Sequence, residues 1–299
     1  MTIYLGTIAR NIEPNFFQLY LFLQEIYSTD ANVKTCIYEN NSNDNTPVML
    51  KILENISPNI QVVCEHFSES ELLAMSKAWT WDKKPCRMEL IAAARNKLLD
   101  MLAAAGCSDK DYVVLFDADM ESACNAGVIL GKIAAFPTDA DALFANGLNR
   151  NRQTYYDMYA LRTVDRPCGP ELLGETFWNT LPKLHFTGRT PILSGFGGLA
   201  IYRGYVLTDN RYSALPTSDL NTFYKRCGVK QVTPMTHVEG VLRGIYLFES
   251  QAEGGLFYYN NSGYAYPIVC EHSTFHARAA NRGQGRFYLD PELVYVSTH

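Results

Sequence analysis

Two carboxylates separated by one small residue follow an apolar run, and their type and spacing suit metal binding. Residues 112–116 read Tyr-Val-Val-Leu-Phe, and Asp117, Ala118 and Asp119 come next. The apolar run predicts a buried central strand of the parallel-sheet type. Residues i and i+2 of an extended chain point the same way, and carboxylate oxygens suit Mg²⁺ or Mn²⁺, which can hold a diphosphate. Because ligands bind outside the carboxyl ends of strands in open α/β sheets, the pair is expected where a substrate arrives.

The triplet alone is also typical of an acidic turn, because aspartate commonly begins loops. The elements before it favour a binding site. Apolar patterns predict strands at 3–9, 33–38 and 60–64 that alternate with helices from residue 16 onward and at 48–56, 69–81 and 87–105. This order predicts an α/β fold. The chain has no Gly-x-x-x-x-Gly-Lys-Ser/Thr loop and no Gly-x-Gly-x-x-Gly motif after the first strand, which argues against P-loop and dinucleotide-binding proteins.

Composition narrows the class of protein further. The 299 residues carry a net charge of −5 with acids and bases interspersed, so neither nucleic acid nor an anionic membrane is indicated as a partner. No apolar run approaches the roughly 20 residues of a membrane span, and the chain begins in a strand without signal-peptide features. A soluble cytoplasmic protein is expected. The eight scattered cysteines form no Cys-x-x-Cys pair and are expected to be mostly reduced core thiols.

Candidate donor-binding residues lie in the first half of the chain. The second strand ends in Glu39 and a loop rich in Asn, Asp and Ser, which contains Ser42 and Asp44. Such a loop can cap the next helix, or it can offer donors and acceptors to a base or ribose. Arg10, directly after the first strand, joins this group. Arg95 lies in the long helix before the acidic strand, where it either faces solvent or points towards a diphosphate.

The second half is less regular. A helix is expected at 125–136, a strand at 140–146, a strand-like run at 155–162, and a glycine-rich strand within 192–203. Residues 165–189 show no clear period, which is typical of a functional lid or binding loop.

Two polar residues stand at a late strand-to-helix junction, with Ser273 or Thr274 as the expected helix cap. Glu271 there is near a helix N-terminus and could take a proton from an acceptor hydroxyl. His272 and His276 are four residues apart and share a helix face, so His272 is a candidate metal ligand. The alternative is a pair of hydrogen-bonded core imidazoles.

In chain order, these motifs resemble those of GT-A glycosyltransferases. The matching pieces are residues 39–46, Arg95-Asn96, Asp117-Ala118-Asp119, residues 156–162, residues 194–203 and Cys270-Glu271-His272. The chain is most similar to the fungal capsule-associated mannosyltransferase-like group and to related enzymes of bacteria and large DNA viruses. The resemblance implies a Rossmann-like mixed sheet, mostly parallel and flanked by helices, in a single domain over 1–299. Residues 1–125 would form the donor half and 126–299 the acceptor half.

The resemblance also implies a function: metal-dependent transfer of a sugar from a nucleoside-diphosphate sugar to a hydroxyl of a glycan acceptor. Asp119 would bind Mn²⁺ or Mg²⁺, and Asp117 would share the metal or reach the ribose. The nucleotide pocket and the diphosphate site would be formed by Arg10, Glu39, Ser42, Asp44 and Arg95. Because related enzymes occur in large DNA viruses, a virus-encoded protein acting in a host cell cytoplasm is consistent with the resemblance.

The catalytic base and the stereochemistry stay open. Glu271 corresponds to the acid that serves as base in many GT-A enzymes, which would give inversion. An apparent insertion at about 205–264 contains Asp219, which is a rival base. A retaining transferase, a sugar-1-phosphate nucleotidyltransferase and a non-catalytic carbohydrate-binding protein of this fold are the alternatives. This chain lacks the glycine- and lysine-rich N-terminal loop that is usual in such nucleotidyltransferases.

Overall fold

The structure is a computed structural model, and it describes residues 1–30, 32–80, 82–123, 125–151, 154–179, 184–229, 245–247, 256–259, 264 and 266–298. Its strands are β1 (Ile3–Ala9), β2 (Val33–Asn40), β3 (Ile60–Glu65), β4 (Tyr112–Phe116), β5 (Met120–Ala123), β6 (Ala142–Leu148), β7 (Thr190–Ile192), β8 (Leu199–Arg203), β9 (Ile245–Leu247), β10 (Phe257–Tyr259) and β11 (Phe287–Ser297). The helices are η1 (Glu13–Asn15), α1 (Phe16–Thr29), α2 (Thr46–Ile56), α3 (Glu69–Ala74), α4 (Arg87–Ala104), α5 (Ala126–Ala134), α6 (Pro170–Leu173), α7 (Glu175–Asn179), α8 (Gly204–Leu207), α9 (Ser218–Arg226) and α10 (Glu271–Asn281).

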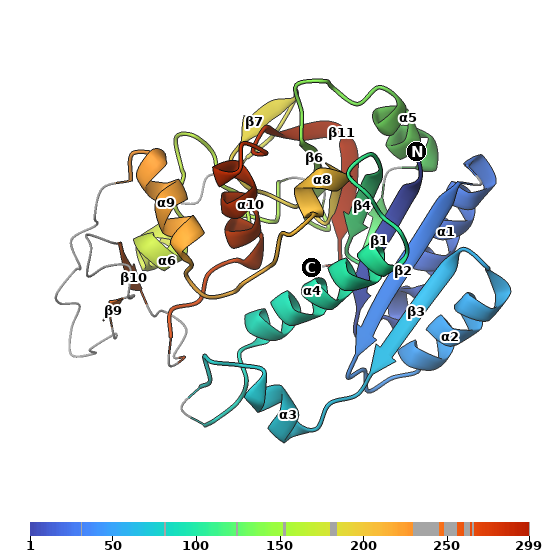
Figure 1. The fold of residues 1–299 in the computed structure, drawn as a ribbon, viewed down its shortest axis with the longest axis horizontal. Helices are drawn as coiled ribbons and strands as arrows, with labels where there is room; N and C mark the ends of the chain where they lie inside the picture. The colour runs from blue at the N-terminus through green and yellow to red at the C-terminus, as the bar shows by residue number, and fades with distance from the viewer. Residues whose placement is uncertain are drawn as a thin grey trace.

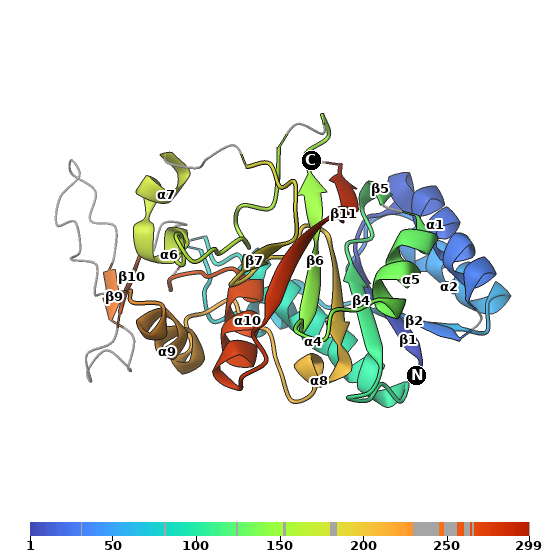
Figure 2. The same ribbon diagram turned by 90° about the horizontal axis from the view of Figure 1, so that it is seen from above.

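A mixed sheet forms the centre of the described chain (Figures 1 and 2). Its strand order is β3-β2-β1-β4-β8-β6-β11-β5, and β7 pairs with β11. Strands β3, β2, β1, β4, β6 and β11 run in one direction, whereas β8, β5 and β7 run against them. The predicted α/β fold with a mostly parallel mixed sheet is therefore confirmed. A separate pair is formed by β9 and β10.

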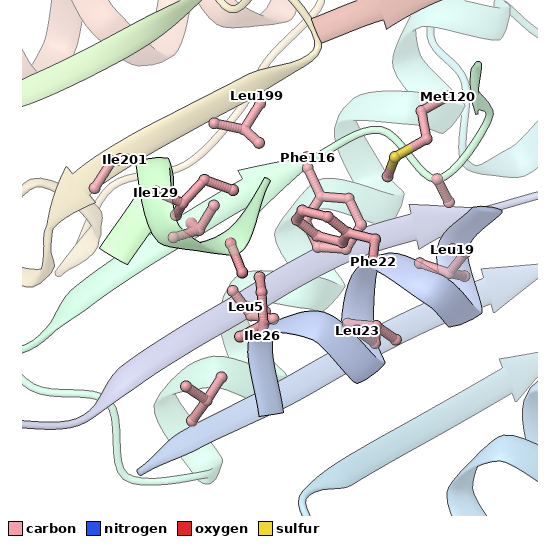
Figure 3. Packing of buried hydrophobic residues seen from close by; sticks show 14 of the residues in the cluster. Leu5, Leu19, Phe22, Leu23, Ile26, Phe116, Met120, Ile129, Leu199 and Ile201 are labelled. Carbon is pink, nitrogen blue, oxygen red and sulfur yellow. The ribbon is translucent and has the colours of Figure 1, made fainter. Parts of the chain in front are cut away.

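Strand β4 is buried on both faces, as its apolar sequence predicts. Val114 and Phe116 pack with α1, α2 and α5 on one face (Figure 3). Val113 and Leu115 pack with α4 and α10 on the other. The sequence predicts a strand of the parallel-sheet type here. Of the two neighbours of β4, however, only β1 is parallel to it, and β8 is antiparallel. Its carboxyl end therefore opens between helices that cover both faces.

Two predicted helices have different ends in the structure, and one predicted strand is not formed. Helix α3 ends at Ala74 rather than continuing towards Trp81, which lies outside the described residues. The chain leaves the helix because Glu89 accepts hydrogen bonds from the Ser76 hydroxyl and the Ala78 N–H, both at 2.7 Å. Helix α10 begins at Glu271, before the predicted cap at Ser273 or Thr274.

The strand predicted at 155–162 is wrong. Tyr155 and Arg162 make isolated bridges to Leu148 and Ser194, and the chain between them turns. The Leu161 N–H donates to the Asp157 carbonyl at 3.2 Å, which closes this turn. The apolar and aromatic residues of the segment fill the core from a loop, so their composition resembled that of a strand.

None of the helices in the described chain is long and apolar enough to cross a bilayer. Seven cysteines are described and all seven are free thiols, whereas Cys124 lies outside the described residues.

Two glycines turn the chain sharply into β8, and their backbone angles explain why glycine stands there. Gly197 and Gly198 have φ of 64° and 82°, a region that side chains disfavour. A Cβ at Gly198 would lie 2.2 Å from ring atoms of Tyr295. The Gly198 carbonyl accepts the Asp117 N–H at 2.9 Å, so this turn also fixes the end of β4.

We expect Gly198→Ala to lower the free energy of unfolding by about 2 to 4 kcal/mol, because it adds backbone strain and a clash with Tyr295. Gly131→Ala in α5 is the matched control, since a Cβ there meets no described atom within 4 Å. That control should raise stability by up to about 1 kcal/mol. Urea denaturation measures both, and equal effects would contradict the account.

Candidate active site

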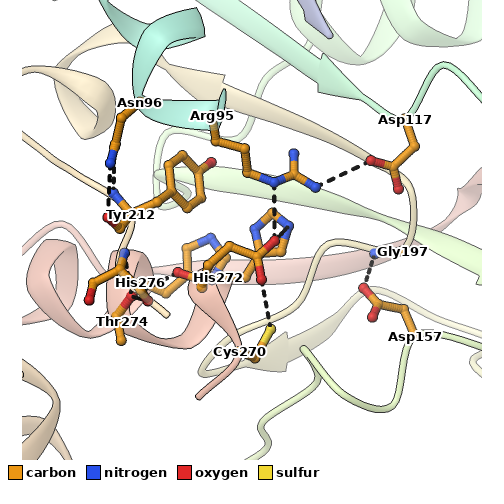
Figure 4. Close-up of polar contacts among 12 residues, drawn as sticks. Arg95, Asn96, Asp117, Asp157, Gly197, Tyr212, Cys270, His272, Thr274 and His276 are labelled. Atoms are coloured by element: carbon orange, nitrogen blue, oxygen red, sulfur yellow. Dashed lines mark hydrogen bonds and ion pairs between the residues drawn. The ribbon is translucent and has the colours of Figure 1, made fainter. Parts of the chain in front are cut away.

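Charged side chains from four segments meet beyond the carboxyl end of β4 (Figure 4). Asp117 follows β4, Arg95 comes from the middle of α4, and Glu271 is the first residue of α10. Asp157 belongs to the loop after β6. Parallel strands and the helices packed on them thus bring residues more than 170 positions apart into contact, as the 176-residue separation of Arg95 and Glu271 illustrates.

Arg95 is the cation that joins two of these acids. Its side chain is 7 % exposed. Nε donates to Glu271 Oε1 at 3.1 Å, and Nη2 donates to Asp117 Oδ1 at 3.2 Å. The guanidinium carbon lies 4.8 Å from the ring centre of Phe196 and 5.8 Å from that of Tyr212. Burial acts to lower the pKa of Arg95, but Asp117 and Glu271 outweigh it and raise the pKa, so the side chain stays charged.

Asp117 is crowded by other negative charges. Burial raises the pKa of its carboxyl to about 7, Asp119 and Asp157 add to that rise, and Arg95 opposes it. Its side chain is still 26 % exposed. Ala118 between the two acids is buried, as its small size allows. Asp117 and Asp119 therefore lie close enough for one charge to disfavour the other.

Asp157 is a fourth acid in this group. Burial raises the pKa of its carboxyl to about 6, Glu271 adds to the rise, and a hydrogen bond from Gly197 opposes it. That N–H lies 3.0 Å from Asp157 Oδ2. Asp157 was not among the candidate residues predicted from the sequence, where its one signal is that it is an acid inside a motif shared with the transferases. Phe196 and Tyr212 were missed as well, because nothing in the sequence marks an aromatic residue that will pack on a distant arginine.

The carboxylates of this site suit a divalent cation as ligands. Asp117, Asp119, Asp157 and Glu271 supply four carboxylates against the single guanidinium of Arg95, and the charges of Asp119 and Asp157 add to the rise that burial causes in the pKa of Asp117. Oxygen ligands and uncompensated negative charge are what Mg²⁺ and Mn²⁺ prefer. Within the described residues, no three side chains of His, Cys, Asp or Glu are gathered as a ready-made metal site. Any bound cation would therefore take further ligands from water or substrate.

His272 is not placed as a ligand in such a group. Its ring stacks on Phe196 with centres 4.3 Å apart, and it is 3 % exposed. Nε2 is 3.5 Å from Glu271 Oε1, and neither ring nitrogen has a hydrogen-bond partner among the described residues. Burial, with Arg95 and His276 adding to it, holds the pKa of His272 well below its usual range, so the ring is neutral. His272 shares a helix face with His276, but it is a buried neutral ring that packs on Phe196.

His276 is a buried, hydrogen-bonded core imidazole, which was the alternative to a metal ligand. Its ring nitrogens lie 2.9 Å from the Ser194 and Tyr202 hydroxyls. Burial lowers its pKa to about 3.

The predicted nucleotide residues gather at the ends of β1 and β2. Glu39 is buried and accepts the Ser42 N–H at 2.9 Å. The Ser42 hydroxyl accepts the Asn11 N–H at 2.9 Å, and Asp44 accepts the N–H groups of Glu13 and Thr46 at 3.2 and 3.0 Å.

Arg10 completes this loop cluster by donating from Nε to the Asn41 carbonyl at 3.2 Å. These bonds brace the loop, which is one role that its sequence left open beside nucleotide binding, although no side chain caps α2 at Asn45. Both roles are compatible, because carboxylate and carbonyl oxygens can accept more than one hydrogen bond.

Asp219 lies away from this site. It stands in the first turn of α9, where its carbonyl and Oδ1 accept hydrogen bonds from Asn281, at 2.9 and 3.3 Å. Asn281 ends α10, whereas Glu271 begins it. At 1.5 Å per residue the two ends of that helix are about 15 Å apart. The structure therefore does not bring Asp219 to the acids of β4, and its placement contradicts the rival-base hypothesis.

The fold and the site define an α/β protein whose acidic residues lie at the carboxyl end of a central strand. Residues 8–182, more than half of the chain, match the family described as Cryptococcal mannosyltransferase 1. The chain therefore belongs to this glycosyltransferase family. A search of curated proteins found no match.

Several solved structures are similar to the chain. A mannosyltransferase from Pyrobaculum calidifontis, in complex with GDP-Man and Mn²⁺, is 11 % identical with a TM-score of 0.45, over 99 % of this chain and 56 % of that one. S. aureus TarS (1–349), in complex with UDP-GlcNAc, is 17 % identical with a TM-score of 0.38, over 71 % and 49 %. Glucosyl-3-phosphoglycerate synthase from Mycobacterium tuberculosis, in complex with Mn²⁺, UDP and phosphoglyceric acid, is 16 % identical with a TM-score of 0.37, over 76 % and 65 %. This chain spans about half the length of the first two.

Removing the buried Arg95 side chain should lower the free energy of unfolding far more than removing an exposed arginine. We expect Arg95→Ala to lower the free energy of unfolding by about 3 to 5 kcal/mol, because it leaves Glu271 buried without its partner. Arg211→Ala is the control. Arg211 pairs with Asp100 at 2.8 Å, both side chains are about half exposed, and its loss should cost less than about 1 kcal/mol. Guanidinium denaturation measures both, and similar losses would contradict the role of Arg95.

Proposed function

We propose that the protein is a metal-dependent glycosyltransferase that moves a sugar from a nucleoside-diphosphate sugar to a hydroxyl of a glycan acceptor. The observation that carries this proposal is the group of carboxylates around Arg95 at the end of β4, in a chain that belongs to a glycosyltransferase family. In this proposal, residues 1–299 form one domain. The donor binds over residues 1–125 and the acceptor over 126–299.

The donor end of the site is supplied by β1, β2 and β4. Asp119 and Asp117 would hold Mn²⁺ or Mg²⁺. When bound, the cation neutralises the negative charge of the diphosphate leaving group. Glu39 and the braced loop with Ser42 and Asp44 line the nucleoside side, and Arg10 extends it. Arg95 holds the Asp117 carboxylate in place through its 3.2 Å bond, and its charge favours the anionic donor.

The chemical step follows from this arrangement. The acceptor oxygen bonds to the anomeric carbon while the bond to the diphosphate breaks, and the electron pair leaves with the diphosphate. Attack on the face opposite the leaving group inverts the anomeric centre, and a carboxylate on that side accepts the hydroxyl proton. Glu271 was the base expected from the sequence. A retaining reaction would need no strong base on the opposite face, so analysis of the product anomer separates the two.

Titration calorimetry with free and sugar-linked nucleoside diphosphates tests this function. The panel contains GDP, GDP-mannose, UDP and UDP-GlcNAc, each with Mn²⁺ and with chelator. We expect one nucleotide to bind wild type only when Mn²⁺ is present. Asp119→Ala should weaken that binding at least about tenfold, because even the loss of a group that only orients a metal ligand costs that much. Asp100→Ala removes an exposed aspartate that pairs with Arg211 and is the control, with binding unchanged.

Two outcomes would contradict the proposal. Binding that ignores both Mn²⁺ and the Asp119 substitution would place the donor elsewhere. If no nucleotide of the panel binds and neither sugar donor is turned over, transfer from GDP and UDP sugars is contradicted, and a non-catalytic carbohydrate-binding protein of this fold is favoured.

A further inference from the structure

We propose that two copies of this chain associate through the outer sides of α1 and α2, which together form one uncharged apolar surface. The inference goes beyond the proposed function and does not depend on it. Helices α1 and α2 lie side by side on one face of the sheet, over β1, β2 and β3 (Figures 1 and 2).

The surface consists of five large apolar side chains that point away from the sheet. Phe17 and Leu21 belong to α1, and Val48, Ile52 and Ile56 belong to α2. Each is between 49 % and 63 % exposed. Within each helix they are four positions apart, so they follow one side of it. These five residues are called the α1–α2 face below.

An apolar outer side is unusual for helices that cover a sheet. The inner sides of α1 and α2 already supply the core with Leu19, Phe22, Leu23, Ile26, Leu50 and Leu53. The outer side of such a helix is normally charged or polar. Of the eleven large hydrophobic side chains that are exposed in the described chain, five belong to the α1–α2 face. A cluster of this kind marks an interaction site, whereas single exposed hydrophobic residues are ordinary.

The few charges on these helices are turned away from the α1–α2 face. Lys51 Nζ donates to the Val62 carbonyl at 2.7 Å and pairs with Glu54 Oε2 at 2.8 Å, so this ion pair lies towards β3. Glu25 Oε1 accepts the Ala126 N–H at 3.1 Å, so it lies towards α5. The sequences of α1 and α2 contain no other charged residue. The strip between these flanks therefore carries no charge.

This composition favours a second copy of the chain as the partner. Helices that lie on anionic membranes carry several Lys or Arg residues beside the apolar side, whereas the one lysine here is already paired with Glu54. A strongly charged partner would bury its charges on the α1–α2 face without compensation. A second copy presents the same uncharged surface, and a two-fold axis matches that surface to itself. The centres of homodimer interfaces are likewise apolar and poor in charge.

The edge of the sheet next to α2 is blocked. Strand β3 stands at the end of the strand order, and an edge strand exposes backbone groups that can pair with another chain. The Val62 N–H, however, donates to Glu54 Oε1 at 2.6 Å, and the Val62 carbonyl accepts from Lys51. Side chains of α2 thus occupy the middle of this edge. Two copies therefore meet through their helices and not through their strands.

The size of the α1–α2 face suits a weak, reversible dimer. At 1.5 Å per residue, α1 and α2 are about 21 and 16 Å long, and packed helices lie about 10 Å apart. The face then covers roughly 350 Å² in plan, whereas a standard interface takes about 800 Å² of surface from each partner. Exposed polar residues at its rim, which include Gln18, Gln24 and Asn55, supply part of the remainder. We expect a Kd on the order of 10 μM.

Sedimentation velocity of the whole chain, from about 1 to 200 μM, tests the inference across that Kd. Wild type should change from monomer to dimer as the concentration rises. Ile52→Glu and Phe17→Glu each bring like charges together in the contact, and each should weaken the dimer at least about tenfold. Val164→Glu is the matched control, because Val164 is 74 % exposed in the loop after β6, and it should dimerise as wild type does. Thermal melting at about 1 μM, where the monomer dominates, should give the same Tm for all four proteins.

Three results would overturn the inference. Wild type that stays monomeric over the whole range has no such dimer. A dimer that survives both Ile52→Glu and Phe17→Glu uses another surface. The third is retention of monomeric wild type on phosphatidylcholine and phosphatidylglycerol vesicles in a flotation assay, lost in Ile52→Glu, which would show that a membrane covers the α1–α2 face. Nucleotide binding is measured separately, so failure of the dimer leaves the proposed function untouched.

Discussion

The ion pairs of Arg95 are the interaction on which the site depends. One guanidinium, 7 % exposed, joins the acid at the end of β4 to the acid at the start of α10, and it arises from α4 between them. Burying three charges costs several kcal/mol in lost hydration, which their attraction offsets only when the geometry is good. The arrangement therefore contributes more to positioning than to stability. It fixes where Asp117 points, and it ties Glu271 at the start of α10 to the end of β4.

A second buried ion pair stabilises the loop that follows β6. Arg162 and Glu171 are fully buried and lie 3.2 Å apart, and Arg162 also donates to the Tyr159 and Leu161 carbonyls at 2.8 and 2.9 Å. These bonds stabilise the loop that carries Asp157.

The sequence predicted the regular part of the fold well, because local apolar patterning decides it. The strand from Ile3 to Ala9 and the strand from Tyr112 to Phe116 have the predicted bounds, since each is buried and ends at a change of polarity. The second half was harder. Tyr155 to Arg162 has the composition of a strand but folds as a loop, whose aromatic rings pack on Phe186 and Tyr295, far away in the sequence.

The same limit applies to the site. The Asp117 and Asp119 pair and Glu271 were found from their positions at element ends, and Arg95 from its place in the helix before the acidic strand. The structure brings Arg95, Asp117 and Glu271 into contact. What the sequence could not give was which acid Arg95 would occupy, because that depends on where α10 crosses α4. For the same reason His272 looked like a ligand on a helical wheel, whereas its neighbours bury it against Phe196.

The account is tested most directly by locating the cation in crystals of wild-type protein grown with GDP and Mn²⁺, or with UDP and Mn²⁺, from anomalous diffraction of manganese. The account predicts one strong anomalous peak in coordination contact with the Asp119 carboxylate and beside Asp117, with the diphosphate adjoining it at the end of β4. A bound nucleotide with no anomalous peak at these acids, or a peak at a site that Asp117 and Asp119 do not reach, would contradict it.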